Sequence, residues 1–152
     1  MGVEPRVKHV SWSVPATLTA DASDIPVFWN NSGHDWTLDE TTGREPTWTP
    51  TAARTGSGSA SDGITWMTLA LNRVSGAAVE TGLCSHVLKT GTTLTAQVGE
   101  PFDNMTGSSF VIPDGTGINF DIDLGAGKVN LTVSVYDRLD FHLLEGTGTD
   151  TS

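Results

Sequence analysis

The amino-acid sequence predicts an all-β protein: an antiparallel β-sandwich of about eight strands, with a jelly-roll-like topology favoured. Three observations lead to this prediction. The composition is rich in Thr, Val and Ser, has 17 Gly and 7 Pro, and is poor in residues that fill helix surfaces. Several short segments alternate apolar and polar residues, and no segment has a convincing helical period. Gly, Pro, Asn and Asp turns separate these segments.

In the first third of the chain, residues 9–14, 25–30 and 36–41 are predicted strands. The polar loop NNSGHD (30–35) is expected to join the second and third of them as a hairpin. Pro26 has no backbone N–H, so its segment is expected at a sheet edge or at the beginning of a strand. The Gly/Ser/Thr-rich stretch 49–63 is expected to be a loop between two halves of the domain.

The next predicted strands are residues 64–74, 82–89, 92–98 and 108–112. Within 64–74, the pattern places Met67, Leu69 and Leu71 on one face and Trp66 on the other. The sequence Pro-Asp-Gly at 113–115 indicates a turn directly after 108–112.

The most regular alternation comes late in the chain, in residues 118–124 and 128–139. Gly125 and Gly127 lie between these two segments and suit a tight hairpin turn. We therefore expect one domain over residues 9–144, with a possible N-terminal arm at 1–8 and a mobile C-terminal tail at 145–152.

The formal net charge is −10, from 8 basic and 18 acidic residues, and this excludes duplex DNA or an anionic membrane as an expected partner. No stretch approaches the ~20 apolar residues of a membrane span, and the N-terminus has no signal-peptide pattern, so synthesis in the cytoplasm is expected. Cys84 is the single cysteine, which excludes an internal disulfide framework.

Asn119, Asp121 and Asp123 alternate with apolar residues and raise the question of a metal site. Side chains along one straight strand cannot all bind one Ca²⁺ ion, which takes six to eight oxygen ligands at about 2.3–2.6 Å. Two of them could do so if the 113–117 loop added Asp114, which makes Asp114, Asp121 and Asp123 weak calcium candidates. The favoured interpretation is that this row is the hydrated outer face of a sheet.

Catalytic patterns are weak, and we expect no enzyme and no cofactor. The carboxylate pairs Asp39-Glu40 and Asp121/Asp123 lie beside no cluster of aromatic and Arg residues that would form a sugar-cleaving cleft. Cys84 and His86 would share one strand face, but Cys84 lies in an apolar run, which favours a buried inert thiol. The four histidines lack the spacing of a metal-binding motif.

The aromatic residues offer binding candidates. Trp29, Trp36 and Trp48 fall close together in the sequence, beside polar loops. They could plug the core, anchor a protein interface, or stack on carbohydrate. Arg6 and Lys8, two of only eight cations, could make a docking arm on an acidic lattice or belong to an ordinary frayed terminus.

Two runs resemble small β-sandwich virion proteins of tailed bacteriophages. In residues 14–43, a T-A-D-x-x-D segment leads to I-P-V-F, a loop and W-T-L-x-E; in residues 91–124, a strand and a Gly/Pro loop lead to VIPDGTGINFDI. This resemblance implies a capsid decoration (cement) protein or a tail-fibre tip, commonly a homotrimer, and transfers no catalytic residue.

The resemblance therefore implies a non-enzymatic structural protein of the virion, assembled in the host cytoplasm and bound to the major capsid protein or another virion protein. The alternative is a carbohydrate-binding or receptor-binding module, in which a tryptophan stacks on sugar. The alternative predicts a monomer with an exposed aromatic face, whereas a trimer would bury one sheet face or edge between subunits.

Overall fold

The computed structural model describes residues 6–18, 20–55, 65–76, 79–89, 93–105, 109–124, 133 and 135–145 of the chain, without the side chains of residues 54, 55, 65, 66, 89 and 93. In this part of the chain, every regular element is a β-strand. The strands are β1 (Val7–Ser13), β2 (Ala22–Trp29), β3 (Trp36–Leu38), β4 (Thr47–Thr49), β5 (Arg54–Thr55), β6 (Thr65–Ser75), β7 (Glu80–Lys89), β8 (Thr93–Leu94), β9 (Glu100–Pro101), β10 (Val111–Ile112), β11 (Thr116–Leu124) and β12 (Arg138–Glu145).

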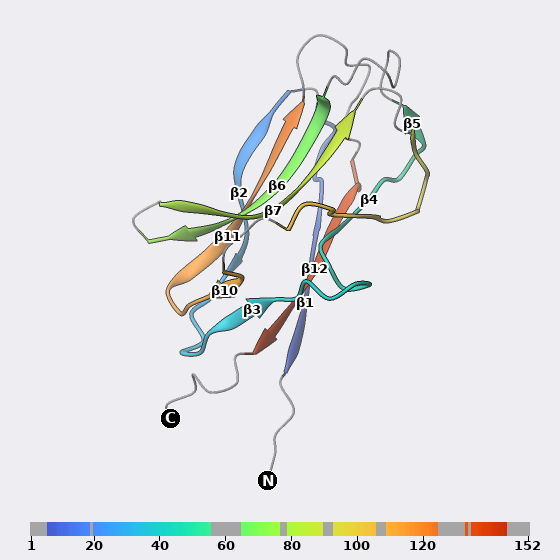
Figure 1. Cartoon of the computed structure of the whole chain (residues 1–152). Helices are drawn as coiled ribbons and strands as arrows, with labels where there is room; N and C mark the ends of the chain where they lie inside the picture. Colours follow the sequence, from blue (N-terminus) through green and yellow to red (C-terminus); the bar gives the residue numbers. More distant parts are fainter. Residues whose placement is uncertain are drawn as a thin grey trace.

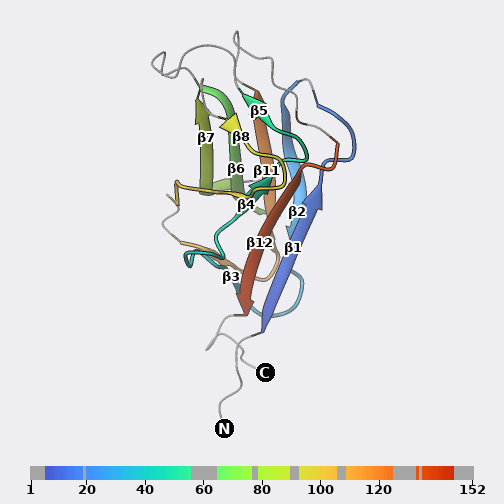
Figure 2. The same cartoon turned by 90° about the vertical axis from the view of Figure 1, so that its right-hand side faces the viewer.

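The strands form two principal antiparallel sheets, which Figures 1 and 2 show as the two layers of a sandwich. One sheet has four strands in the order β2-β11-β6-β7. The other has six strands around β12, in the order β10-β3-β12-β4-β9 with β1 paired to β12 as well. Strands β5 and β8 form a separate two-stranded ribbon. The predicted antiparallel β-sandwich is therefore confirmed.

Strand β12 organises the six-stranded sheet. It pairs along its length with β1, from Ser13↔Arg138 to Val7↔Leu144. Its other edge is shared by two short strands, with β4 at the beginning of β12 and β3 at its end. Leu139, Phe141 and Leu143 of β12 are fully buried, so alternate residues of this strand supply the centre of the core.

The core forms between the facing sides of the two sheets. The four-stranded sheet contributes the alternating residues Ile118, Phe120 and Ile122 of β11 and Met67, Leu69 and Leu71 of β6 to this core, and all six are buried. Trp48 of the six-stranded sheet contacts Phe120 with ring centroids 5.8 Å apart. The inward face expected for residues 64–74 is confirmed, while the Trp66 side chain lies outside the described part.

Two predicted hairpins are wrong. Residues 30–35 join β2 to β3, which belong to different sheets, so this loop crosses from one layer to the other. Arg138 and Leu139, expected to continue a hairpin with 118–124, lie in β12 of the opposite sheet, and Tyr136 before them has a positive φ of 73° that interrupts an extended strand. The rest of 128–139 is undescribed apart from Val133, which bridges Leu18, and residues 135–137.

Other expectations differ in extent. The predicted strand 92–98 is only Thr93–Leu94, because the chain turns at 96–97 with Gln97 at a φ of 61°. The stretch 49–63 was expected to be a loop, but β4 ends at its first residue and β5 lies inside it. Pro26 lies in β2, an edge strand of its sheet, as predicted.

The beginning of β1 and the end of β12 lie side by side at one end of the sandwich (Figures 1 and 2). Lys8 belongs to β1, and the N–H of Glu145 donates to the carbonyl oxygen of Arg6, so residues 6–8 extend the sheet instead of forming a separate arm. Residues 1–5 and 146–152 lie outside the described part. Among the described residues, no helix has the length and apolar character to cross a membrane.

Candidate functional site

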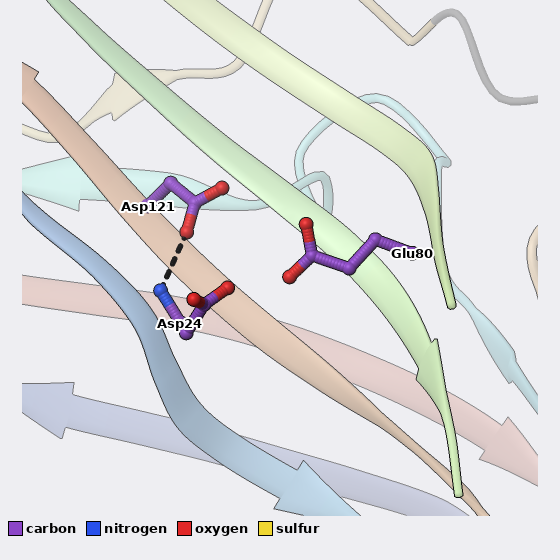
Figure 3. A group of neighbouring side chains, drawn as sticks. All are labelled: Asp24, Glu80 and Asp121. Atoms are coloured by element: carbon purple, nitrogen blue, oxygen red, sulfur yellow. Dashed lines mark hydrogen bonds between the residues drawn. The ribbon is translucent and has the colours of Figure 1, made fainter. Parts of the chain in front are cut away.

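In the described part of the chain, three carboxyl side chains come close enough together to be tested as a metal site: Asp24, Glu80 and Asp121, here called the acidic cluster. One oxygen from each carboxyl group lies within 4.8 Å of the others. The three residues come from β2, β7 and β11 of the four-stranded sheet, and Figure 3 shows their carboxyl groups turned toward one another. The cluster therefore spans the outer face of this sheet.

Local backbone irregularity places Asp24 in the cluster. The pairing of β2 with β11 shifts register twice, and Asp24 has a φ of 57°, in the left-handed region that Asp tolerates better than most residues. This conformation lets the Asp24 N–H donate to Asp121 Oδ1 at 2.7 Å, the bond drawn in Figure 3. Asn72 Nδ2 donates to the second oxygen, Asp121 Oδ2, at 2.8 Å.

The closeness of the three carboxyl groups changes the pKa of Glu80. Its pKa is raised above the ordinary value, first by the hydrogen bond with the Asp24 side chain, then by burial and by repulsion from Asp121 and Asp24, against an opposing hydrogen bond with Asn119. A proton shared between Glu80 and Asp24 relieves the repulsion of like charges. The cluster thus presents hydrogen-bond donors as well as acceptors as the pH falls.

The cluster could supply three side-chain oxygens to a divalent cation. Ca²⁺ takes six to eight oxygens, so three carboxylates would be about half of a shell. Both oxygens of Asp121 already accept hydrogen bonds from protein groups, which reduces what that residue has left for an ion. These residues alone therefore describe an acidic surface and not a complete metal site.

The sequence-predicted calcium candidates are not brought together. Asp121 joins the acidic cluster, and Asp123 is exposed further along β11. Asp114 lies before the other end of β11 and accepts a hydrogen bond from the Gly33 N–H at 3.0 Å. The 113–115 turn is held against the 30–35 loop, since the Gly115 N–H also donates to the Asn30 carbonyl, so the turn does not fold over Asp121.

Asn119, Asp121 and Asp123 do lie on the outer face, as the favoured interpretation predicted, while Ile118, Phe120 and Ile122 between them are buried. Sequence reasoning missed Asp24 and Glu80 as partners of Asp121. Asp24 is 97 residues from Asp121 in the chain, and no spacing pattern signals such a contact. Only the polar T-A-D-x-x-D segment marked Asp24 at all.

The three candidate tryptophans have different environments. Trp48 is fully buried, and Trp36 is nearly so, with its Nε1–H donating to Ser32 Oγ at 3.1 Å. Trp29 is 50% exposed at the end of β2. A platform of three rings is therefore not formed: Trp36 and Trp48 belong to the core, and Trp29 alone of the three is available to a ligand or partner.

The two candidate cations lie near one another on β1 or just before it. Arg6 forms an ion pair with Glu145 at the end of β12. Further along the same pair of strands, His9 of β1 contacts Asp140 of β12 at 2.9 Å and stacks on His142 with ring centroids 4.7 Å apart. This outer face of β1 and β12, here called the β1–β12 ribbon, carries charges of both signs.

The other residues considered as catalytic candidates, Cys84, His86 and Asp39, are buried within the fold. Burial raises the pKa of the Cys84 thiol to about 12, which leaves it protonated and unreactive at neutral pH. His86 is buried on the same strand, with Nδ1 3.1 Å from Asp103 Oδ1 and its ring stacked on Phe102. Asp39 is buried and accepts a hydrogen bond from the Thr41 N–H.

No protein-family model and no curated protein matches this sequence. The chain has some similarity to solved structures of infectious bursal disease virus. For the Gx strain, the identity is 15% and the TM-score 0.39, covering 95% of this chain and 33% of that one. For the VP2 subviral particle, the identity is 12% and the TM-score 0.39, and the match covers 96% of this chain and 34% of that one. For the Gt strain, the identity is 10% and the TM-score 0.38, and the match covers 95% of this chain and 34% of that one.

The chain thus spans about a third of the length of each of these proteins. Identities and TM-scores this low establish neither a shared fold nor a shared function. The function is therefore argued from the residues of this chain.

Proposed function

We propose that this protein is a non-enzymatic structural component of a tailed-phage virion, most specifically a capsid decoration protein that acts as a homotrimer. The observation that carries the proposal concerns the two runs that resemble such proteins, residues 14–43 and 91–124. They contain β2 and β3 in the first run and β10 and β11 in the second. In each sheet, a strand of the first run pairs with a strand of the second: β2 with β11 in the four-stranded sheet, and β3 with β10 in the six-stranded sheet.

The pairing is specific in register. In the four-stranded sheet, Phe28 of β2 pairs with Ile118 of β11. In the six-stranded sheet, Thr37 of β3 pairs with Val111 of β10. Two runs that are separate in the sequence and resemble the same family are thus paired with each other in both sheets, while β8 and β9 of the second run pair with β5 and β4. This supports reading the resemblance as structural similarity and not as shared composition.

The remaining features fit a binding protein better than an enzyme. The Cys84 thiol is buried, with its pKa raised to about 12, and the carboxyl groups of Asp39 and Asp121 are held by backbone N–H groups. A decoration protein would act through buried interface area and through avidity from several identical contacts. In this role, the partner is the major capsid protein and the location is the virion, assembled in the host cytoplasm.

The test begins with the native mass of the purified 16.0 kDa chain by light scattering, with and without a chelator. We expect a trimer that the chelator does not dissociate. The chain is then mixed with capsids assembled from the major capsid protein of the same virus. Saturable binding and a higher capsid melting temperature are expected, whereas a monomer that does not bind these capsids would refute the proposal.

A further inference from the structure

Trp29 has an unusual place for a large aromatic side chain. It lies at the end of β2 on the outer face of the four-stranded sheet, and the residue is 50% exposed. The six-membered ring of its indole lies over Gly117 of β11: a Cβ added to Gly117 would come within 2.6 Å of Trp29 Cε3 and 3.3 Å of Cζ3. The absence of a side chain at 117 thus allows the ring to rest against the sheet, with half of the residue still open to solvent.

An open hollow of about 520 Å³ lies on the same outer face of the sheet. It is lined by Asp24, Val74, Glu80 and Asn119. The sheet register puts two of its lining residues, Val74 and Glu80, in the same row as Trp29, because Gly117 pairs with Trp29 on one side and with Val74 on the other, and Val74 pairs with Glu80. The volume falls within the roughly 300–1,000 Å³ of small-ligand sites.

The polar groups of the hollow are of mixed character. Asn119 offers an amide, and Glu80 and Asp24 offer carboxyl groups. Asp121 beneath them is already satisfied by the Asp24 N–H and Asn72. A ligand that fits this face needs one flat, weakly polar surface to lie on the indole. It also needs, one strand spacing or more away from that surface, several groups that both donate and accept hydrogen bonds.

We propose that this face, defined by Trp29, Val74, Asn119, Glu80 and Asp24, binds a saccharide. One pyranose ring stacks its C–H face on the exposed indole of Trp29. The hydroxyls of that ring or of the next sugar unit enter the hollow and bond to Asn119, Glu80 and Asp24, since each hydroxyl is both a donor and an acceptor. The alternative of a bare metal ion at the acidic cluster makes no use of Trp29 or Val74.

This site goes beyond the proposed role on the capsid and does not depend on it. A decoration protein with such a face would carry a glycan-binding surface on the virion. Because the test uses the isolated chain without capsids, its failure and the failure of the proposed function are separate results.

The experiment titrates the ¹⁵N-labelled chain with maltose, cellobiose, lactose and chitobiose and follows the indole N–H signal of Trp29 by NMR. We expect at least one disaccharide to shift this signal and those of Asn119 and Glu80 saturably, both in EDTA and in calcium chloride. Trp29→Ala is expected to weaken binding about tenfold or more, the size of one lost aromatic contact.

The matched control is Tyr136→Ala, which removes an aromatic residue that is 71% exposed outside this face and should leave the affinity unchanged. Glu80→Ala is the second test variant: its exposed side chain leaves the core intact, and binding should weaken while folding persists. The proposal is overturned if none of the four disaccharides shifts the Trp29 signal, if binding survives both variants, or if calcium chloride alone perturbs Asp24 and Glu80.

Discussion

Two outer faces of the sandwich carry clustered charges, and they are arranged in opposite ways. On the β1–β12 ribbon, Asp140 accepts a hydrogen bond from Arg138 Nε at 2.6 Å and contacts His9 at 2.9 Å. On the four-stranded sheet, Asp24, Glu80 and Asp121 bring three carboxyl groups within 4.8 Å of one another. One face pairs charges of opposite sign, and the other gathers charges of the same sign.

The pKa values of the two faces move in opposite directions as a result. Burial would raise the pKa of Asp140, but hydrogen bonds from Arg138, Ser11 and His9 lower it below the ordinary value. The pKa of Glu80 is raised by its hydrogen bond with Asp24, by burial and by the neighbouring carboxylates. At neutral pH, the charged groups of the ribbon therefore stabilise the fold, whereas the like charges of the acidic cluster lower its stability, as is common at ligand-binding faces.

The largest expected effect is at Gly117, which lies under Trp29 on the second face. In Gly117→Ala, the new Cβ would lie 2.5 Å from the backbone carbonyl oxygen of Phe28, so β2 must move away from β11. We expect the free energy of unfolding to fall by about 1–3 kcal/mol, the usual range for overpacking. Urea unfolding measures this effect.

The matched control is Gly82→Ala in β7 of the same sheet. Its added Cβ would meet nothing closer than Asn72 Oδ1 at 3.9 Å, which is an ordinary contact. We expect little change in stability, because the substitution causes no clash. Equal effects of the two substitutions would show that β2 does not pack on β11 as described.

A smaller effect is expected on the ribbon. Asp140→Asn should lower stability at neutral pH by about 0.5–1 kcal/mol, since the lost charge pairs are partly screened by solvent. The folded pKa of Asp140 is lower than the unfolded value of 3.8, so its stabilisation is present above that value and is lost as the pH falls through the folded pKa. Wild type and variant should therefore converge in acid, as thermal unfolding across pH would measure.

The smallest effect, with the opposite sign, is expected at the acidic cluster. Glu80→Gln should raise stability at neutral pH by a few tenths of a kcal/mol, because it removes one of three like charges on an exposed face. The folded pKa of Glu80 lies above 4.5, so its stabilising contribution is present below 4.5 and is lost as the pH rises through the folded pKa. The benefit of the variant should therefore disappear in acid.

Asp123→Asn is the control for that measurement, because Asp123 lies on the same strand and face but outside the cluster. Its stability at neutral pH should match that of the wild type. A loss of stability in Glu80→Gln at neutral pH would contradict the description of the cluster as mutually repelling carboxyl groups.

The sequence predicts which side of a strand faces inward far better than which strand lies next to it. Alternation correctly assigned Ile118, Phe120 and Ile122 to the core and Asp121 to the surface, because burial on one face imposes a period of two. The same alternation says nothing about sheet membership. The 30–35 loop was expected to close a hairpin, yet it passes between layers, since a polar loop of this length suits either path.

The candidate site was still less predictable. Trp29, Trp36 and Trp48 are alike in sequence context, and only packing separates the exposed ring from the two buried ones. The meeting of Asp24 with Asp121 depends on a shift in strand register and on one left-handed residue. Local propensity does not specify either feature.

The pairing of β1 with β12 has a consequence for the order in which the protein folds. In the six-stranded sheet, β1, β3 and β4 each pair with β12, near the other end of the chain. During synthesis, this sheet cannot form around its central strand until residues 138–145 have left the ribosome. Because such distant contacts must close before they stabilise, we expect refolding in milliseconds to seconds. The chain would be most prone to aggregation while β1 still lacks its partner strand.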